Sequence, residues 1–146
     1  MSAVELFVGL KIPDTTAITA FHTIEKMGCK DVKKVKREIY YKFEIEGDAE
    51  KFKNKIGKVD ILVNANKNKF TNELQKEENA TYILVKDTDD RCEGLLHTLQ
   101  NRLGLKEIKS MERGILWTLY GCSKETAKEI GNKLLHNENY QEMETV

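Results

Sequence analysis

The stretch Ile39-Tyr40-Tyr41-Lys42-Phe43-Glu44-Ile45 decides the fold class of this chain. It is rich in aromatic and β-branched residues, and apolar and polar side chains alternate along it. In a strand, the even-numbered positions share one face and the odd-numbered positions share the other. We therefore predict a half-buried β-strand whose odd-numbered face, from Ile39 to Ile45, packs against a core.

Capped helices precede and follow this strand. Asp14 stands at an N-cap position before apolar residues at helical spacing, and Gly28 ends that segment. Asp48 begins a second, short helix that ends at Gly57. The first half also contains three further segments that predict strands, at residues 5–12, 32–35 and 59–63.

The same pattern restarts near residue 81. Strands are predicted at 82–85, 105–111 and 115–120, and Ser123 caps the last helix. Asp89 or Asp90 caps the helix between the first two of these strands, and Gly104 ends it. The acidic tail from residue 137 is expected to fray. The predicted core stripe of the earlier helix consists of Cys92, Leu95, Leu96, Leu99 and Leu103.

The two halves also share residues at a nearly constant offset. His22-Thr23-Ile24 matches His97-Thr98-Leu99 at 75 residues, whereas Arg37 matches Arg113 at 76 residues. One residue of slip inside the first helix reconciles these offsets. Few identities remain, so a tandem duplication and a chance match are both open at this point. The second offset also relates Gly28 to Gly104 and Ile39 to Ile115.

We predict an α+β fold of two βαββα units with ferredoxin-like element order, at residues 1–64 and 81–146, separated by a polar linker at 65–80. A unit of about 60 residues buries only ~60% of its unfolded surface and is marginal alone. The strand at 115–120 is also apolar on both faces. We therefore expect the units to join into one body, with sheets flanked by helices and with homo-oligomerisation as a further way to cover apolar surface.

Composition argues against several classes of protein. The 146 residues include 24 basic and 24 acidic side chains, and the zero net charge argues against a polybasic nucleic-acid binder. No apolar run approaches the ~18 residues of a membrane span, and the first residues lack the pattern of a signal peptide. Cys29, Cys92 and Cys122 fit neither a disulfide framework nor a CxxC metal site, which indicates reduced thiols in a cytoplasmic protein.

Common catalytic patterns are missing from the sequence, which has no HExxH, GxGxxG, GxxxxGK[ST] or GxSxG motif. The matched His22 and His97 are either a symmetric pair of ligands or bases, or residues on a helix flank, and we favour the flank. Cys122 precedes the cap Ser123, where a helix N-terminus lowers a thiol pKa, but we favour an inert, buried cysteine. We expect no catalytic residue, no metal site, no cofactor and no activity of the chain alone.

Residues 30–42 form the one charge cluster, with six basic and two acidic side chains. With Tyr40 and Tyr41, this composition is compatible with single-stranded nucleic-acid binding through phosphate neutralisation and base stacking. The alternative is a solvated strand whose lysines block edge-to-edge pairing. The matching stretch 106–118 has three basic and two acidic residues, so basicity is not shared by the halves, and we favour the solvated strand.

Several of these segments resemble PurS, the small subunit of the multi-subunit formylglycinamide ribonucleotide amidotransferase (phosphoribosylformylglycinamidine synthase). The resemblance rests on the helix from Asp14 to Gly28 and on the stretches Val35-Lys36-Arg37-Glu38 and Phe43-Glu44-Ile45-Glu46-Gly47. PurS is typically a single unit, so this chain resembles a tandem pair. Leu134-Leu135-His136-Asn137 is similar to the family's closing motif, and Leu62-Val63-Asn64 is a weaker echo of it.

The resemblance implies a non-catalytic role in purine biosynthesis. In that family the small subunit bridges a glutaminase subunit, which releases ammonia, and an ATP-dependent synthetase subunit, which consumes it. The implied partners are those two subunits, in an amidotransferase (ligase) complex. Two alternatives remain: a metabolite-sensing module with ACT-like units and, less favoured, a single-stranded nucleic-acid binder. The partner-binding residues that the resemblance implies are Lys36, Arg37, Arg113 and Asn137.

Overall fold

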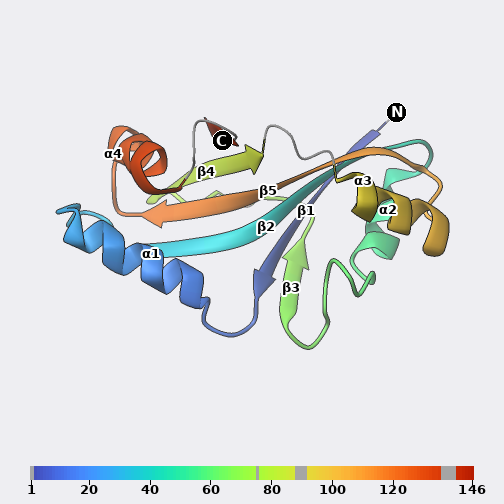
Figure 1. Cartoon of the computed structure of the whole chain (residues 1–146), viewed down its shortest axis with the longest axis horizontal. Coiled ribbons are helices and arrows are strands. Elements are labelled where there is room, and N and C mark those ends of the chain that lie inside the picture. Colours follow the sequence, from blue (N-terminus) through green and yellow to red (C-terminus); the bar gives the residue numbers. More distant parts are fainter. Residues whose placement is uncertain (1, 75, 88–91, 136–140) are drawn as a thin grey trace. The chain divides into compact units, whose positions relative to one another are not determined.

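The chain has an α+β fold, as the sequence predicts, and its strands form a six-stranded antiparallel sheet (Figure 1). The computed structural model describes residues 2–74, 76–87, 92–135 and 141–146. The strand order is β3-β1-β2-β5-β4-β6, which reads symmetrically from its centre outward. The strands are β1 (Ser2–Leu10), β2 (Lys34–Ile45), β3 (Asn68–Thr71), β4 (Ala80–Asp87), β5 (Ile108–Tyr120) and β6 (Gln141–Thr145).

Three of the helices begin where the sequence predicts, because a side chain caps the N-terminus of each. The side chains of Asp14, Asp48 and Ser123 each accept hydrogen bonds from backbone N–H groups of the first helical turn. The predicted caps Asp89 and Asp90 lie outside the described residues. The helices are α1 (Thr15–Lys26), α2 (Ala49–Ile56), α3 (Glu93–His97) and α4 (Lys124–Ile130), and π-helical segments at Thr98–Arg102 and Gly131–Leu135 continue α3 and α4.

The π-helical segment after α3 explains the slip between the two sequence offsets. A π-helical turn takes up an extra residue within a helix. The segment Thr98–Arg102 lies between His97, which keeps the offset of 75, and Gly104, which keeps the offset of 76. The same turn rotates the helix face, so Leu103 is 48% exposed although it belongs to the predicted core stripe. The other members of the stripe pack in or against one core.

Each half of the chain runs β-α-β-α-β, so the predicted βαββα order is wrong in two respects. The pairs of strands predicted at 32–35 with 39–45, and at 105–111 with 115–120, are single long strands, β2 and β5. The strand predicted at 59–63 is a set of turns whose Leu62 and Val63 side chains are buried. A short apolar run has no periodicity that separates a strand from a buried turn.

Each half ends in a short edge strand. Both edge strands lie in segments for which the sequence predicts no regular structure. Strand β3 lies within the predicted linker at 65–80 and pairs with β1, and strand β6 lies within the tail that was expected to fray and pairs with β4. Both are short and rich in polar residues, so their backbone ladders, and not their composition, stabilise them. The division of the sequence at 64 and 81 stays a prediction.

The chain forms two compact units that do not coincide with its halves. Unit 1 comprises Met1–Lys11, Ile39–Leu74 and Asp89–Arg113, and unit 2 comprises Ile12–Glu38, Gln75–Thr88 and Gly114–Val146. Each unit therefore contains parts of β2 and β5. Each also contains the first helix of the other half: α3 belongs to unit 1 and α1 belongs to unit 2.

This exchange of helices completes both cores. In unit 1, Leu99 packs with Leu6, Phe43 and other residues of the first half, and Leu99 has no exposed surface. In unit 2, Ile24 of α1 packs with Ile83 and other residues of the second half, and Ile24 is equally buried. Full burial of one such side chain contributes about 1.5–3 kcal/mol. Each half therefore depends on the other for part of its core.

The strand registers repeat as well. Leu6 of β1 lies opposite Tyr41 of β2, and Ile83 of β4 lies opposite Trp117 of β5. Leu6 and Ile83 are 77 residues apart, and Tyr41 and Trp117 are 76 apart, close to the offsets seen in the sequence. All four side chains belong to the cores of their units. The same spacing relates the pair Val8↔Ile39 to the pair Val85↔Ile115.

Each half also has a glycine against which a side chain of its edge strand packs. The ring of Phe70, on β3, occupies the space that a Cβ at Gly57 would need, next to the end of α2. The sulfur of Met143, on β6, occupies the corresponding space at Gly131, next to the end of α4. In both halves, therefore, the second helix ends at a glycine that admits an apolar side chain from the edge strand.

The helix exchange predicts that neither half folds alone. Fragments 1–74 and 75–146, expressed separately, are each expected to be unfolded as monomers, because each lacks the helix that completes its core. Mixing them should restore a 1:1 complex with cooperative thermal unfolding. Circular dichroism and size-exclusion chromatography with light scattering measure both results. A monomeric fragment that melts cooperatively would contradict the dependence.

Gly121 is predicted to be much less replaceable than Gly47. Both precede a capped helix at positive φ, +93° and +109°, so alanine costs about 1–3 kcal/mol of backbone strain at either position. At Gly121 the added Cβ would also lie 2.5 Å from the backbone oxygen of Asp31, whereas nothing lies within 4 Å at Gly47. We expect Gly121→Ala to lower the free energy of unfolding by at least about 1 kcal/mol more than Gly47→Ala. Equal losses in urea denaturation would contradict this.

Candidate functional site

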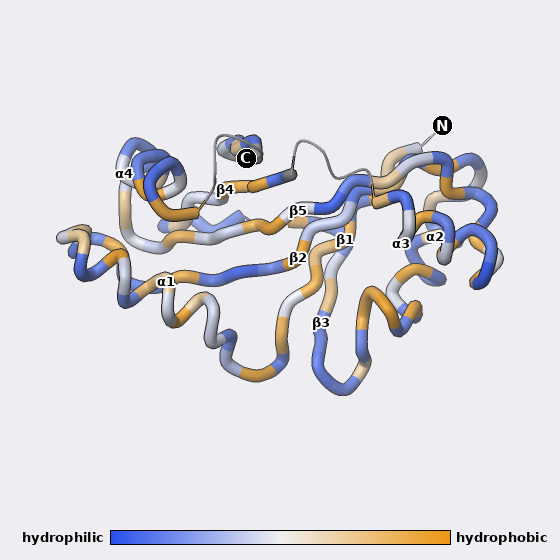
Figure 2. The backbone as a smooth tube through the Cα atoms, in the orientation of Figure 1, coloured by the Kyte–Doolittle hydropathy of each residue, from blue (hydrophilic) through white to orange (hydrophobic). Residues whose placement is uncertain are grey.

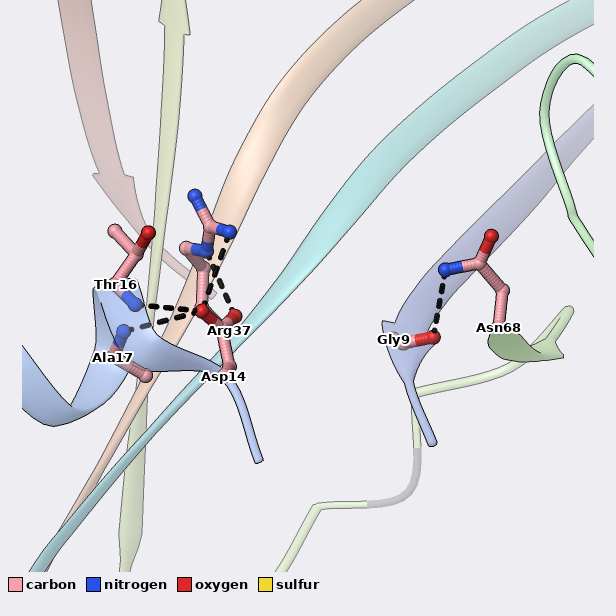
Figure 3. Close-up of polar contacts among 6 residues, drawn as sticks. All are labelled: Gly9, Asp14, Thr16, Ala17, Arg37 and Asn68. Atoms are coloured by element: carbon pink, nitrogen blue, oxygen red, sulfur yellow. Dashed lines mark hydrogen bonds and ion pairs between the residues drawn. The ribbon is translucent and has the colours of Figure 1, made fainter. Parts of the chain in front are cut away.

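The predicted partner-binding residue Arg37 lies in unit 2 and is paired with Asp14 (Figure 3). The Arg37 Nε donates to Asp14 Oδ2 at 3.0 Å, and Nη2 donates to Oδ1 at 3.3 Å. The same Asp14 carboxylate accepts from the backbone N–H groups of Thr16 at 3.0 Å and Ala17 at 3.3 Å. One carboxylate thus caps α1 and ties it to β2.

The Asp14–Arg37 ion pair stabilises the fold. The two side chains retain 15% and 25% of their exposure, so the pair is largely shielded from solvent. A carboxylate at a helix N-terminus also interacts favourably with the helix dipole. The positive charge of Arg37 is therefore already compensated, which leaves little of it to attract an anionic partner.

Three lysines of the 30–42 cluster also make contacts within unit 2. Lys36 forms an ion pair with Glu38 at 3.6 Å, and the Lys34 ammonium lies 5.5 Å from the centre of the Tyr120 ring. Lys33 donates to the backbone oxygen of Lys30 at 3.3 Å. These contacts favour the solvated strand over a continuous phosphate-binding track.

The two tyrosines of the cluster, Tyr40 and Tyr41, belong to unit 1 and are buried. Tyr40 is 5% exposed, and its hydroxyl donates to the Glu5 carboxylate at 2.8 Å. Tyr41 is 4% exposed and stacks against Phe43 in the core. A ring must present a face to stack on a base. The stacking component of the nucleic-acid interpretation therefore has no support in this geometry.

Arg113, which matches Arg37 in the sequence, lies in unit 1 beside Tyr41. Burial raises the pKa of the Tyr41 phenol, and the Arg113 charge and its hydrogen bond to the phenol oppose that rise. Unlike Arg37, Arg113 is exposed. Of the predicted binding residues that the structure describes, it is the most accessible cation. Asn137 lies outside the described residues.

The echo of the closing motif at Leu62-Val63-Asn64 forms the turn before β3. Leu62 and Val63 fill the core of unit 1, and the backbone oxygen of Asn64 accepts from the N–H groups of Lys67 and Asn68. The Asn68 amide also donates to the backbone oxygen of Gly9 at 3.3 Å, which attaches the turn to β1 (Figure 3). In the second half, Leu134 and Leu135 likewise pack against the core of unit 2. The leucine and valine residues of both motifs that the structure describes thus have a structural role in the cores of their units.

The two histidines that the structure describes lie on helix surfaces, and the environment of Cys122 makes it unreactive. His22 contacts Glu25 at 3.3 Å, and His97 contacts Asn101 at 2.7 Å, both on exposed helix surfaces. Burial raises the pKa of the Cys122 thiol, and the neighbouring Cys29 and Asp31 add to that rise. Because the thiolate is the reactive form, a raised pKa indicates an inert cysteine.

A second polar group gathers around Tyr120 and was not singled out in the sequence. Burial raises the pKa of Tyr120, as do a hydrogen bond to the Glu77 carboxylate and the negative charge of that group. The Tyr82 hydroxyl accepts from the Glu77 backbone N–H at 2.8 Å. Within unit 2, these contacts attach the 76–79 segment to β4 and β5. A raised phenol pKa provides neither a base nor a nucleophile at neutral pH.

Unit 1 contains one buried carboxylate oxygen that sequence reasoning missed. Glu107 Oε1 has no hydrogen-bond partner, and its nearest positive charge is Lys55 Nζ at 3.5 Å. The Glu107 backbone oxygen accepts from Glu46 at 2.9 Å, so the residue is held at the point where β5 begins. A single glutamate in a polar stretch carries no sequence signal of burial.

Among the described residues, no group of three histidine, cysteine, aspartate or glutamate side chains is placed to hold a metal ion. No helix in the described part of the chain has the length and apolar character to cross a membrane. The sequence matches neither a known family model nor a curated protein.

Replacing Asp14 should separate its two roles. Asp14→Ala removes both the cap and the ion pair, with an expected loss of about 1–2 kcal/mol in the free energy of unfolding. Asp14→Asn keeps a cap and loses only the charge, so we expect about half that loss, fading in high salt. Asp48→Asn is the matched control, because Asp48 caps α2 without an ion pair among the described residues. Equal effects of the two asparagine variants in urea denaturation would contradict the role of Arg37.

Proposed function

We propose that this chain is a PurS-like assembly subunit, built as a tandem pair, that bridges the glutaminase and synthetase subunits of a formylglycinamide ribonucleotide amidotransferase in the cytoplasm. It holds the two enzymes together and catalyses nothing by itself. The observation that supports this proposal is the internal repeat: every element of the first half has a counterpart in the second, and the halves exchange their first helices.

A duplicated chain suits a bridging role for a physical reason. Two copies of one module offer two similar surfaces, and a fused pair cannot dissociate when its concentration is low. The symmetric strand order, the matched strand registers and the two glycine contacts of the edge strands are each consistent with duplication of an ancestral module. In this proposal the fused pair replaces the small-subunit dimer.

The proposed contact residues differ in how free they are to bind. Arg113 is exposed, so it is the first candidate for a contact with a partner carboxylate. Lys36 retains 38% of its side-chain exposure beside Glu38 and is the second. Arg37 supports α1 through Asp14, so we assign it a positioning role. Asn137 remains a proposed contact from the family resemblance alone.

Affinity purification tests this function. The full-length chain, tagged and expressed at its native level, is recovered from extract of its own cells, and mass spectrometry identifies the proteins bound to it. We expect a glutaminase and an ATP-dependent synthetase subunit. The purified partners should convert formylglycinamide ribonucleotide to its amidine with glutamine as ammonia source only when this chain is present.

A charge reversal provides the control. Arg113→Glu should lower the recovery of partners several-fold, whereas Arg102→Glu, an equal charge change at another exposed position of unit 1, should not. Recovery of neither enzyme with the unaltered chain would refute the proposed function.

A further inference from the structure

The two edge strands have opposite charge. Strand β3 is the edge of unit 1 and pairs only with β1, and strand β6 is the edge of unit 2 and pairs only with β4, as far as the described residues extend. Each therefore has an outer side that no described strand pairs with. An open edge of this kind is a template for another strand.

The β3 edge is basic. Lys69 lies on β3, and Lys67 extends the ladder because its backbone oxygen accepts from Lys11 at 2.9 Å. Both lysine side chains are exposed, and no carboxylate in the described part of the chain pairs with them. Lys67 is the turn residue immediately before β3 and lies two positions before Lys69, and Phe70, which is 41% exposed, lies on the face of β3 opposite Lys69, against Gly57. The hydrophilic stretch is visible in Figure 2.

The β6 edge is acidic. Glu142 and Glu144 are both exposed and share one face of the strand, while Met143 lies on the other face against Gly131. Lys86 of the neighbouring β4 lies 3.9 Å from Glu142 and 3.8 Å from Glu144, so one positive charge faces two negative charges. The edge keeps an excess of negative charge.

The charges of the two edges are complementary. In an antiparallel pairing of β6 of one molecule with β3 of another that places Lys67 opposite Glu144 and Lys69 opposite Glu142, Phe70 and Met143 are diagonal neighbours on the other face. A shift of one residue would put Phe70 beside a glutamate and Lys69 beside Met143, so the pattern selects one family of registers. Pairing β3 with β3, or β6 with β6, would place like charges opposite one another, which is destabilising.

We propose that the partner of each edge is a second copy of this chain, with β3 of one molecule bound to β6 of the next. The contact is heterologous, so each molecule has one donor and one acceptor edge and can bind two neighbours. The interface is short and charged, and the association is therefore expected to depend on concentration and to weaken with salt. This inference concerns the purified chain alone, so it stands or fails independently of the proposed function.

Sedimentation equilibrium of the purified full-length chain tests the proposal. In low salt, we expect the average mass to rise with concentration above the monomer mass of 16.8 kDa, and to return toward it in high salt. Lys67→Glu with Lys69→Glu makes both edges acidic, and Glu142→Lys with Glu144→Lys makes both edges basic. Each variant alone should associate about tenfold or more weakly than the unaltered chain.

Mixing provides the decisive comparison. The all-acidic and all-basic variants should associate with each other, because each then offers the charge that the other lacks, and a chain with all four changes should self-associate again. Lys51→Glu with Lys58→Glu, exposed positions of unit 1 outside β3, should leave association unchanged. Glu142→Gln with Glu144→Gln is the milder variant if charge reversal beside Lys86 impairs folding.

Two results would overturn the proposal. One is an unaltered chain that stays monomeric at every concentration in low salt, which would leave the edges to a different protein. The other is association that the charge changes do not affect, which would assign it to another surface.

Discussion

The exchange of first helices is the contact on which the rest of this structure depends. Helix α1 from the first half fills the core of unit 2, and α3 from the second half fills the core of unit 1. Without that exchange, each half would expose the apolar face of its strands beside a single short helix. Because burial of apolar surface is the main favourable term in folding, the two halves form one cooperative system.

Much of the remaining structure organises the ends of these elements. Asp14 caps the exchanged helix α1 and joins it through Arg37 to β2, so one carboxylate sets both the start of the helix and its attachment to the sheet. Gly121 admits the backbone of the 29–33 loop, and a hydrogen bond of 2.8 Å from Lys33 to the Tyr120 oxygen closes that contact. Residues that stand out by charge or conformation in the sequence are here supports of the fold.

The sequence and the structure differ most at the proposed binding residues. The family resemblance implied Arg37 and Arg113 equally, yet one is compensated by a carboxylate and the other is exposed beside a phenol. The sequence does not reveal that difference. Asp14, the partner of Arg37, is 23 residues away, and the tyrosine beside Arg113 lies in the other half of the chain. The edge strands were missed for a related reason, since their ladders with β1 and β4 outweigh a polar composition.

Structural features that depend on residues close together in the sequence could be predicted from the sequence. Caps at Asp14, Asp48 and Ser123, the alternating strand at 39–45 and the offset between the halves could all be read from neighbouring residues. Tertiary structure alone decided that the apolar run at 59–63 is a turn, that β3 and β6 form, and which core each first helix completes. Those outcomes depend on contacts between distant segments, where the burial of a whole face, and not the preference of any single stretch, determines the lowest free energy.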